Sequence, residues 1–230
     1  MSNKTVAALY PHRFQADAVI NDLVAMKYDR DYISVLSHRD IDSDGNRDES
    51  AAKGLTAAEG ATAAAAGGAA GGILASLGLA AIPGIGWVLA AGPIGSVIAS
   101  SLVAGAVGAV GGGVTGALTS NGISEADAHA FSEGVRRGGT LVVLTVPADD
   151  VEKVTAALHR HNPINLDRTV ERWRSKGWDK YDPAMAPYQG DDVVVERKHF
   201  EDHTNYASNK PTAEQRRRYI RDYEGPNLSL

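Results

Sequence analysis

The stretch of sequence that decides the fold is residues 60–124, GATAAAAGGAAGGILASLGLAAIPGIGWVLAAGPIGSVIASSLVAGAVGAVGGGVTGALTSNGIS. Of these 65 residues, 17 are glycine, 17 are alanine and none is Asp, Glu, Lys or Arg. Two long runs, about 60–82 and 94–120, are separated by a shorter stretch that begins and ends with proline. Because proline ends helices, this organisation predicts two helices joined by a turn, a hairpin that brings the chain back to its starting side.

Small residues recur at every third or fourth position along both runs. This spacing puts a flat stripe on each helix and lets two backbones approach closely. Glycine costs up to about 1 kcal/mol per residue in an exposed helix, so close packing has to compensate. We expect the hairpin to associate through Gly60, Ala64, Gly68, Gly72, Gly105, Gly108, Gly112 and Gly116, with its tip at Pro83, Gly84, Gly86, Trp87 and Pro93.

The environment of this hairpin has two interpretations. A run of about 23 residues, at roughly 1.5 Å per residue, reaches across the hydrocarbon core of a bilayer, and the large aliphatic residues of the second run favour insertion. The same small-residue stripes suit a soluble homo-oligomer whose hairpins are buried at its centre. The sequence predicts self-association in both cases and leaves open whether the hairpin contacts membrane lipid or only copies of itself.

The segments on either side of the hairpin have the hydrophobic patterns of short strands and amphipathic helices. Ser124, followed by Glu125 and Asp127, is a typical helix start. Together the two flanks supply β-α-β and β-α-β, which is the split βαβ, ferredoxin-like plan of an α+β domain. We expect strands over residues 5–10, 32–36, 140–146 and 164–166, and helices over 14–26, 125–137 and 149–161.

The chain therefore divides into four parts. The predicted first half of the α/β domain is 1–49, the helical hairpin is 50–122, the second half of the domain is 123–166, and a polar, charged extension occupies 167–230. Pure linkers lack aromatic residues, whereas this extension contains many, so we expect parts of it to pack on its own domain or a neighbouring one. These aromatic residues are Trp173, Trp178, Tyr181, Tyr188, Phe200, Tyr206, Tyr219 and Tyr223.

Composition excludes several classes of protein. The 230 residues carry a net charge of −5, which gives no general reason to bind nucleic acid. There is no cysteine, so disulfides, thiolate catalysis and cysteine-ligated metals are ruled out. The first residues lack the apolar stretch of a signal peptide. We expect a cytoplasmic protein, placed at the inner face of the cytoplasmic membrane if its hairpin contacts lipid.

An acidic loop resembles half of a calcium site. Carboxylates at the first, third and fifth positions, followed by a glycine, wrap a hard cation, and Asp40, Asp42 and Asp44 have this spacing, with Asp48 at the ninth position. The twelfth position is Ala51 where a glutamate is usual. Calcium is thus the one cofactor that the sequence suggests, and a solvated acidic linker is the alternative.

Three other motifs have ordinary structural explanations. Residues 111–116 satisfy G-x-G-x-x-G but follow no strand, so helix packing explains them better than a dinucleotide. His199 and His203 lie four residues apart, as on a metal-binding helix face, but lack a convincing third ligand. The basic residues 216–218, on a short helix that begins near Pro211, have acids close by and suit a solvated face.

No nucleophile elbow, phosphate-binding loop or paired-carboxylate pocket is recognisable in the sequence. We therefore expect a protein that is not an enzyme, with no catalytic residues and no small-molecule substrate. Its predicted partner is itself, with membrane lipid as a second candidate.

The sequence resembles the YflT-type heat-induced stress protein family and related low-temperature-induced bacterial proteins. The resemblance covers about residues 4–166 and is carried by 16–28, 33–36, 80–86, 89–94, 122–125 and 133–142. The IPGIG and LAAGPI pieces within these segments are its more specific parts. The resemblance implies a bacterial stress-response protein with a glycine-zipper hairpin, and it implies no activity, cofactor or catalytic residue.

Overall fold

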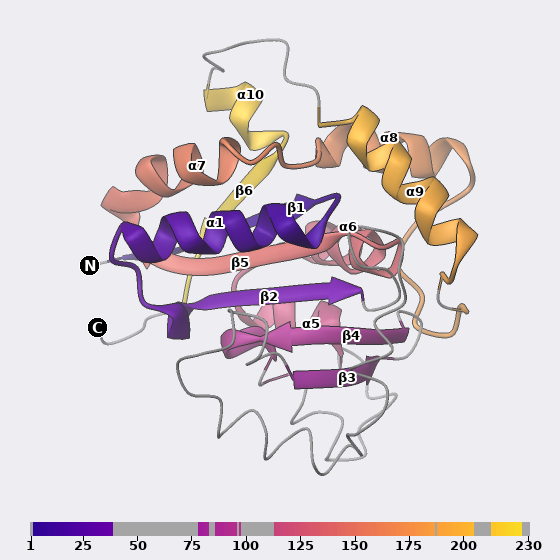
Figure 1. The fold of residues 1–230 in the computed structure, drawn as a ribbon, viewed down its shortest axis with the longest axis horizontal. Helices are drawn as coiled ribbons and strands as arrows, with labels where there is room; N and C mark the ends of the chain where they lie inside the picture. The colour runs from indigo at the N-terminus through magenta and orange to yellow at the C-terminus, as the bar shows by residue number, and fades with distance from the viewer. Residues whose placement is uncertain are drawn as a thin grey trace.

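The computed structural model describes residues 2–38, 78–82, 86–95, 97, 113–186, 188–204 and 213–226. Figure 1 shows one sheet with helices packed on it. The strands are β1 (Asn3–Tyr10), β2 (Ile33–His38), β3 (Gly78–Ile82), β4 (Gly86–Ala91), β5 (Thr140–Pro147) and β6 (Ile220–Glu224). The helices are α1 (Arg13–Ala25), α5 (Val114–Ser120), α6 (Glu125–Arg136), α7 (Val151–His159), α8 (Leu166–Ser175), α9 (Asp191–Asp202) and α10 (Ala213–Arg217), with single 3₁₀ turns at Arg30–Tyr32 and Ala148–Asp150.

The sheet is antiparallel throughout, although its strands do not lie in the order in which they occur in the sequence. Its strand order is β3-β4-β2-β5-β1-β6, and each neighbouring pair is antiparallel. β1 and β5 form the longest ladder, from Asn3 opposite Pro147 to Tyr10 opposite Thr140. Because β1 and β2 both pair with β5 in the antiparallel sense, they run parallel to each other and are joined by α1, as a β-α-β unit requires.

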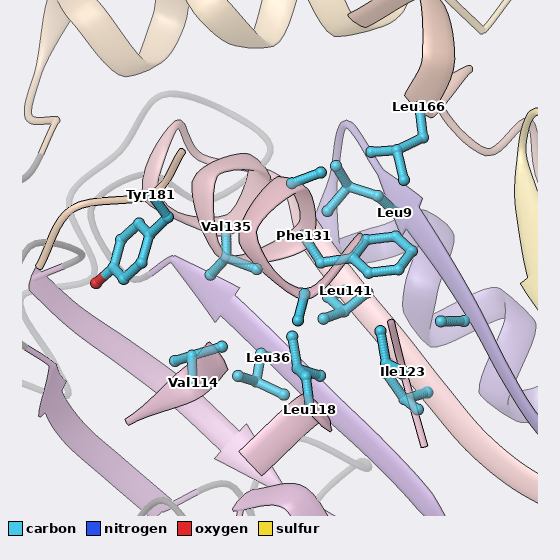
Figure 2. Close-up of a cluster of buried hydrophobic side chains, with 14 of the residues drawn as sticks. Leu9, Leu36, Val114, Leu118, Ile123, Phe131, Val135, Leu141, Leu166 and Tyr181 are labelled. Atoms are coloured by element: carbon cyan, nitrogen blue, oxygen red, sulfur yellow. The ribbon is translucent and has the colours of Figure 1, made fainter. Parts of the chain in front are cut away.

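Side chains of the central strands are buried on both faces of the sheet, as the alternation of a strand requires when each face is covered. Val6 and Ala8 of β1 pack with α1 and α7 on one face. Ala7 and Leu9 pack with α5, α6 and the C-terminal extension on the other. Figure 2 shows this second cluster, in which Leu9 lies near Phe131. The helical layer on the second face makes the fold three layers deep at its centre.

The structure confirms most of the predicted elements that flank the insert. β1, β2 and β5 lie where strands were expected, and α1, α6 and α7 lie where helices were expected. The predicted cap of α6 is present, since the Ser124 side chain accepts a hydrogen bond from the Asp127 backbone N–H at 3.3 Å. The α+β character of the chain is therefore correct.

The predicted edge strand at residues 164–166 is wrong. Ile164 makes one backbone hydrogen bond to Leu9, at 2.8 Å, and Leu166 already begins α8, whose N-cap is Asn165. The edge of β1 pairs instead with β6, more than fifty residues further along the chain. A five-residue ladder satisfies more backbone groups than the short 164–166 segment can.

The predicted helical hairpin is wrong in its described middle part. Residues 78–82 belonged to the expected first helix and Gly86 and Trp87 to its turn, but they form β3 and β4, a β-hairpin that extends the sheet beside β2. The second expected helix does not run unbroken to 120, because Gly113 has φ +88° and precedes α5. Intrinsic helix preference is weak, and unpaired backbone groups along β2 favour an extended neighbour.

Gly122 should be a sensitive point of this fold. It has φ +87°, and a Cβ there would lie 1.9 Å from the backbone oxygen of Glu224 in β6. Gly177 provides a matched control, because it has φ +89° and no atom within 4 Å of its Cβ position. We expect Gly122→Ala to lower the free energy of unfolding by about 3 kcal/mol or more, and Gly177→Ala by about 1 kcal/mol, as measured by urea denaturation. Equal losses would contradict this account of how β6 is docked.

Candidate functional site

The described parts of the uncharged segment pack against the rest of the domain. After β4 the chain turns at Gly92, whose φ is +76° and whose Cβ position lies 2.2 Å from the Ile33 carbonyl oxygen. Ile94 is buried, and its backbone N–H donates to the Ser34 hydroxyl at 3.1 Å. Val114 and Leu118 of α5 are buried in the core. The segment therefore contributes strands and a helix to the same sheet and core as its flanks.

The structure describes only some of the predicted association residues. Gly116 lies in α5 and is half-buried, and Pro93 is exposed just after β4. Gly86 and Trp87 lie in β4. The remaining predicted residues of the stripe and tip lie outside the described residues: Gly60, Ala64, Gly68, Gly72, Gly105, Gly108, Gly112, Pro83 and Gly84.

The described part of the chain contains no metal site built from the predicted motifs. Asp40, Asp42, Asp44 and Asp48 all lie outside it. Among the described residues, no group of three or more His, Asp or Glu side chains is placed to hold a metal ion. Gly113, within the G-x-G-x-x-G motif, is the N-cap of α5, and residues 98–112 before it lie outside the described part of the chain.

The most developed side-chain constellation is one that the sequence analysis missed. We call it the arginine–glutamate clasp, and it consists of Glu133, Arg136, Arg137, Arg172 and Glu196. Arg136 binds Glu133 through two hydrogen bonds, Nε to Oε2 at 2.9 Å and Nη2 to Oε1 at 2.7 Å. Arg137 Nε donates to Glu133 Oε1 at 2.5 Å. These contacts follow from helix geometry, because residues three and four positions apart on α6 share a face.

The same clasp joins α6 to the C-terminal extension. Arg137 Nη1 lies 3.2 Å from Glu196 Oε1 on α9. Glu196 Oε2 accepts from Arg172 Nη2 of α8 at 2.5 Å. The charges thus alternate from Arg136 through Glu133, Arg137 and Glu196 to Arg172, across three helices that are separate in sequence.

The clasp is buried and surrounded by aromatic rings. Glu133 is 0 % exposed and Arg136 is 2 % exposed. The Arg136 guanidinium lies 4.8 Å from the centre of the Tyr188 ring, and that of Arg137 lies 4.9 Å from the centres of the Tyr188 and Trp173 rings. Cations gain from the negative faces of aromatic rings, most of all when they are desolvated. The extension therefore shields the charges that hold it.

This arrangement performs a structural task. Both carboxylates of the clasp accept charge-assisted hydrogen bonds from arginines on more than one side, which leaves them fixed as acceptors. Removing one partner of such a buried pair leaves an uncompensated charge and is strongly destabilising. The spacing of Glu133, Arg136 and Arg137 within α6 could have been detected in the sequence. The partnership with Glu196 could not, because nothing local links α6 to α9.

A second polar contact ties β6 to α6. The Tyr223 hydroxyl donates to Asp127 Oδ2 at 2.8 Å. Burial raises the pKa of the Tyr223 hydroxyl, and the charge of the Asp127 carboxylate raises it further. The phenol therefore keeps its proton and stays a donor, as the contact requires.

Comparison with known protein families gives a match over part of the chain. A family described as "Protein of unknown function (DUF1269)" matches residues 81–176, from the end of β3 to just beyond α8. No curated protein and no solved structure matches the chain. Within the described ranges, no helix has the length and apolar character needed to cross a bilayer.

The clasp predicts a large difference between two glutamates. Glu133→Gln leaves Arg136 and Arg137 buried without their carboxylate, and we expect it to lower the free energy of unfolding by about 3–5 kcal/mol. Glu214→Gln removes an exposed partner 3.9 Å from Arg218, and we expect a change within about 0.5 kcal/mol. Urea denaturation of the two variants measures both. Similar effects would show that the clasp does not hold the extension.

The stability of the extension should fall in mild acid. Burial lowers the pKa of His203, and the nearby charges of Arg168, Arg172 and His199 lower it further, while Asp202 acts in the opposite direction. As pH falls through about 6.5, the ordinary pKa of histidine, the unfolded chain takes up this proton before the folded chain does, so stability is lost. We expect His203→Gln to reduce the loss of melting temperature between pH 7.5 and 5.5. His199→Gln removes only the smallest of the charges that act on His203, so it should reduce that loss less than His203→Gln does.

Proposed function

We propose that this protein is a non-catalytic assembly protein that self-associates through its uncharged segment. The observation that carries the proposal is the run of 65 residues without an Asp, Glu, Lys or Arg, in a chain that has 28 acidic and 23 basic residues elsewhere. A segment of that length without charge favours burial against protein or lipid over exposure to water. Its small-residue stripes suit contact with another copy of the same segment.

The two edges of the sheet support self-association at the side of this segment. Edge strands are usually protected by charged side chains, because their open backbone groups otherwise pair with another chain. β6 at one edge has the sequence Ile-Arg-Asp-Tyr-Glu, with three charged residues. β3 at the other edge has the sequence Gly-Leu-Ala-Ala-Ile, with none. The uncharged edge strand belongs to the uncharged segment, so both features point to the same side of the domain.

Membrane contact is the second candidate, and the segment's aliphatic content supports it. The later run, about residues 94–120, carries repeated Ile, Leu and Val residues and no charge. Val97 within it is 42 % exposed. Such a surface gains free energy on entering either lipid or a protein interior. Membrane contact would thus add a lipid partner to the proposed self-association.

We also propose a fold family and a biological setting for this protein. We propose that β1-α1-β2 and β5-α7-β6 are the two halves of a split βαβ domain, because their strands lie in the order β6-β1-β5-β2. We further propose a role in a bacterial stress response at the cytoplasmic side of the membrane. This role is supported by the sequence resemblance described above.

Replacing either of two alanines by leucine tests the assembly proposal. Ala64 lies on the predicted small-residue stripe and Ala66 lies off it, and both are in the uncharged segment. Ala64→Leu should weaken self-association about tenfold or more, because an added side chain holds the backbones apart. Ala66→Leu should change it less than threefold. Sedimentation velocity of the full chain over a concentration series measures both.

The unsubstituted protein provides the decisive control for that series. A clean monomer at all concentrations would overturn the proposal, and so would equal effects of the two alanine variants. Measuring the size of the native protein with and without detergent, together with flotation on liposomes, separates the two environments. Assembly without detergent and no flotation would support association between copies alone.

A further inference from the structure

Helices α8 and α9 bring together positively charged side chains that make few or no ion pairs in the clasp. Figure 1 shows these two helices next to each other. The Trp173 and Phe200 rings pack edge to face with their centres 6.2 Å apart. His203, which ends α9, is held on the start of α8 by two contacts: its Nδ1 lies 3.0 Å from the Thr169 hydroxyl, and its carbonyl oxygen accepts from the Asn165 N–H at 3.2 Å. The end of α9 therefore lies against the first turns of α8.

Two arginines flank this junction. Arg168 precedes Thr169 in the chain and is exposed, and Arg172 lies one turn further along the same face of α8. Within the described ranges the Arg168 guanidinium has no carboxylate partner. Arg172 donates Nη2 to Glu196, while its Nε and Nη1 atoms are buried and have no hydrogen-bond partner there. An unpaired N–H of a guanidinium favours an anionic acceptor.

Most acids near the junction are engaged elsewhere. Glu196 is shared by Arg137 and Arg172. Asp167 pairs with Arg221, and Glu201 binds His12 at 2.6 Å. Asp202 is the acid whose charge acts on His203, against Arg168, Arg172 and His199. Around His203, three positive groups therefore act against one acid.

We propose that the α8–α9 junction is a binding site for a phosphate group, with Arg168 and His203 as its donors and Arg172 as a further positive charge. Arg168 supplies an exposed guanidinium, whose planar fork matches phosphate oxygens. His203 keeps Nδ1 on Thr169, so Nε2 is the ring nitrogen left for a ligand. Arg172 adds a second positive charge that acts on His203. The same positive charge argues against the metal site that the His199 and His203 spacing first suggested, because a cation would be repelled.

The ligand class is an inorganic phosphate or a terminal phosphomonoester. The free anion and a lipid headgroup such as phosphatidic acid offer the same chemistry. The site does not depend on the assembly function proposed above, since none of its residues lies in the uncharged segment. A failure of one proposal therefore leaves the other standing.

The test uses the full chain and inorganic phosphate as the probe, at constant ionic strength. The His203 ring is followed by NMR and assigned from the signal that is lost in His203→Gln. We expect phosphate to bind with a Kd of the order of 1 mM and to raise the pKa of His203, because the bound anion favours the charged ring. No change of the His203 signal up to about 20 mM phosphate would overturn the proposal.

Two arginine variants give the matched control. Arg168→Gln should weaken phosphate binding about tenfold, the loss expected for one charge-assisted contact. Arg174→Gln removes the same charge from an exposed position of the same helix, and it should weaken binding less than twofold at physiological salt. Both side chains are exposed, so both variants should keep the melting temperature of the unsubstituted protein. Equal weakening by the two would show non-specific attraction and overturn the site.

Vesicles identify the source of the phosphate. Binding of the full chain to vesicles that contain phosphatidic acid, lost in Arg168→Gln and kept in Arg174→Gln, would assign the site to a lipid headgroup. Binding of free phosphate without vesicle binding would assign it to a soluble ligand. Vesicle binding that both variants retain would contradict a headgroup at this site.

Discussion

The antiparallel pairing of β1 with β5 is the constraint on which the rest of this structure depends. Both strands are apolar along their central residues, and these side chains alternate between two buried clusters. A sheet that is apolar on both faces needs a layer on each. The α1 and α7 helices cover one face, and they come from the β-α-β units themselves. The other face is covered by α5, α6 and the C-terminal extension, so the inserted segment and the extension are both necessary to complete the core.

This requirement explains why the extension is attached by buried charges as well as by apolar contacts. Trp173 and Phe200 contribute large apolar surfaces to the second face, which would hold the extension without specifying its register. The arginine–glutamate clasp adds directional contacts between α6, α8 and α9. Burying these charges has a desolvation cost, which the bidentate geometry and the neighbouring rings offset. We regard the clasp as the feature that fixes the position of α9 relative to α6.

The uncharged segment then combines an observed role in the fold with a proposed role in assembly. Its described parts complete the sheet and the core, through β3, β4 and α5. Its overall composition is what supports our proposal of assembly, because a stretch so long without charge is poorly suited to water.

The sequence by itself determined the elements that depend on local patterns. The apolar runs of β1 and β5, the amphipathic spacing of α1 and the Ser124 cap of α6 are written into neighbouring residues, and the structure has them where they were expected. Only the tertiary structure decided the identity of the last strand, the extended form of residues 78–82 and the partners of Glu133. β6 replaces the expected 164–166 strand because the edge of β1 selects the segment that pairs best. Glu196 meets Arg137 because folding brings α9 to α6. Such choices depend on contacts between residues far apart in the chain, which no local pattern encodes.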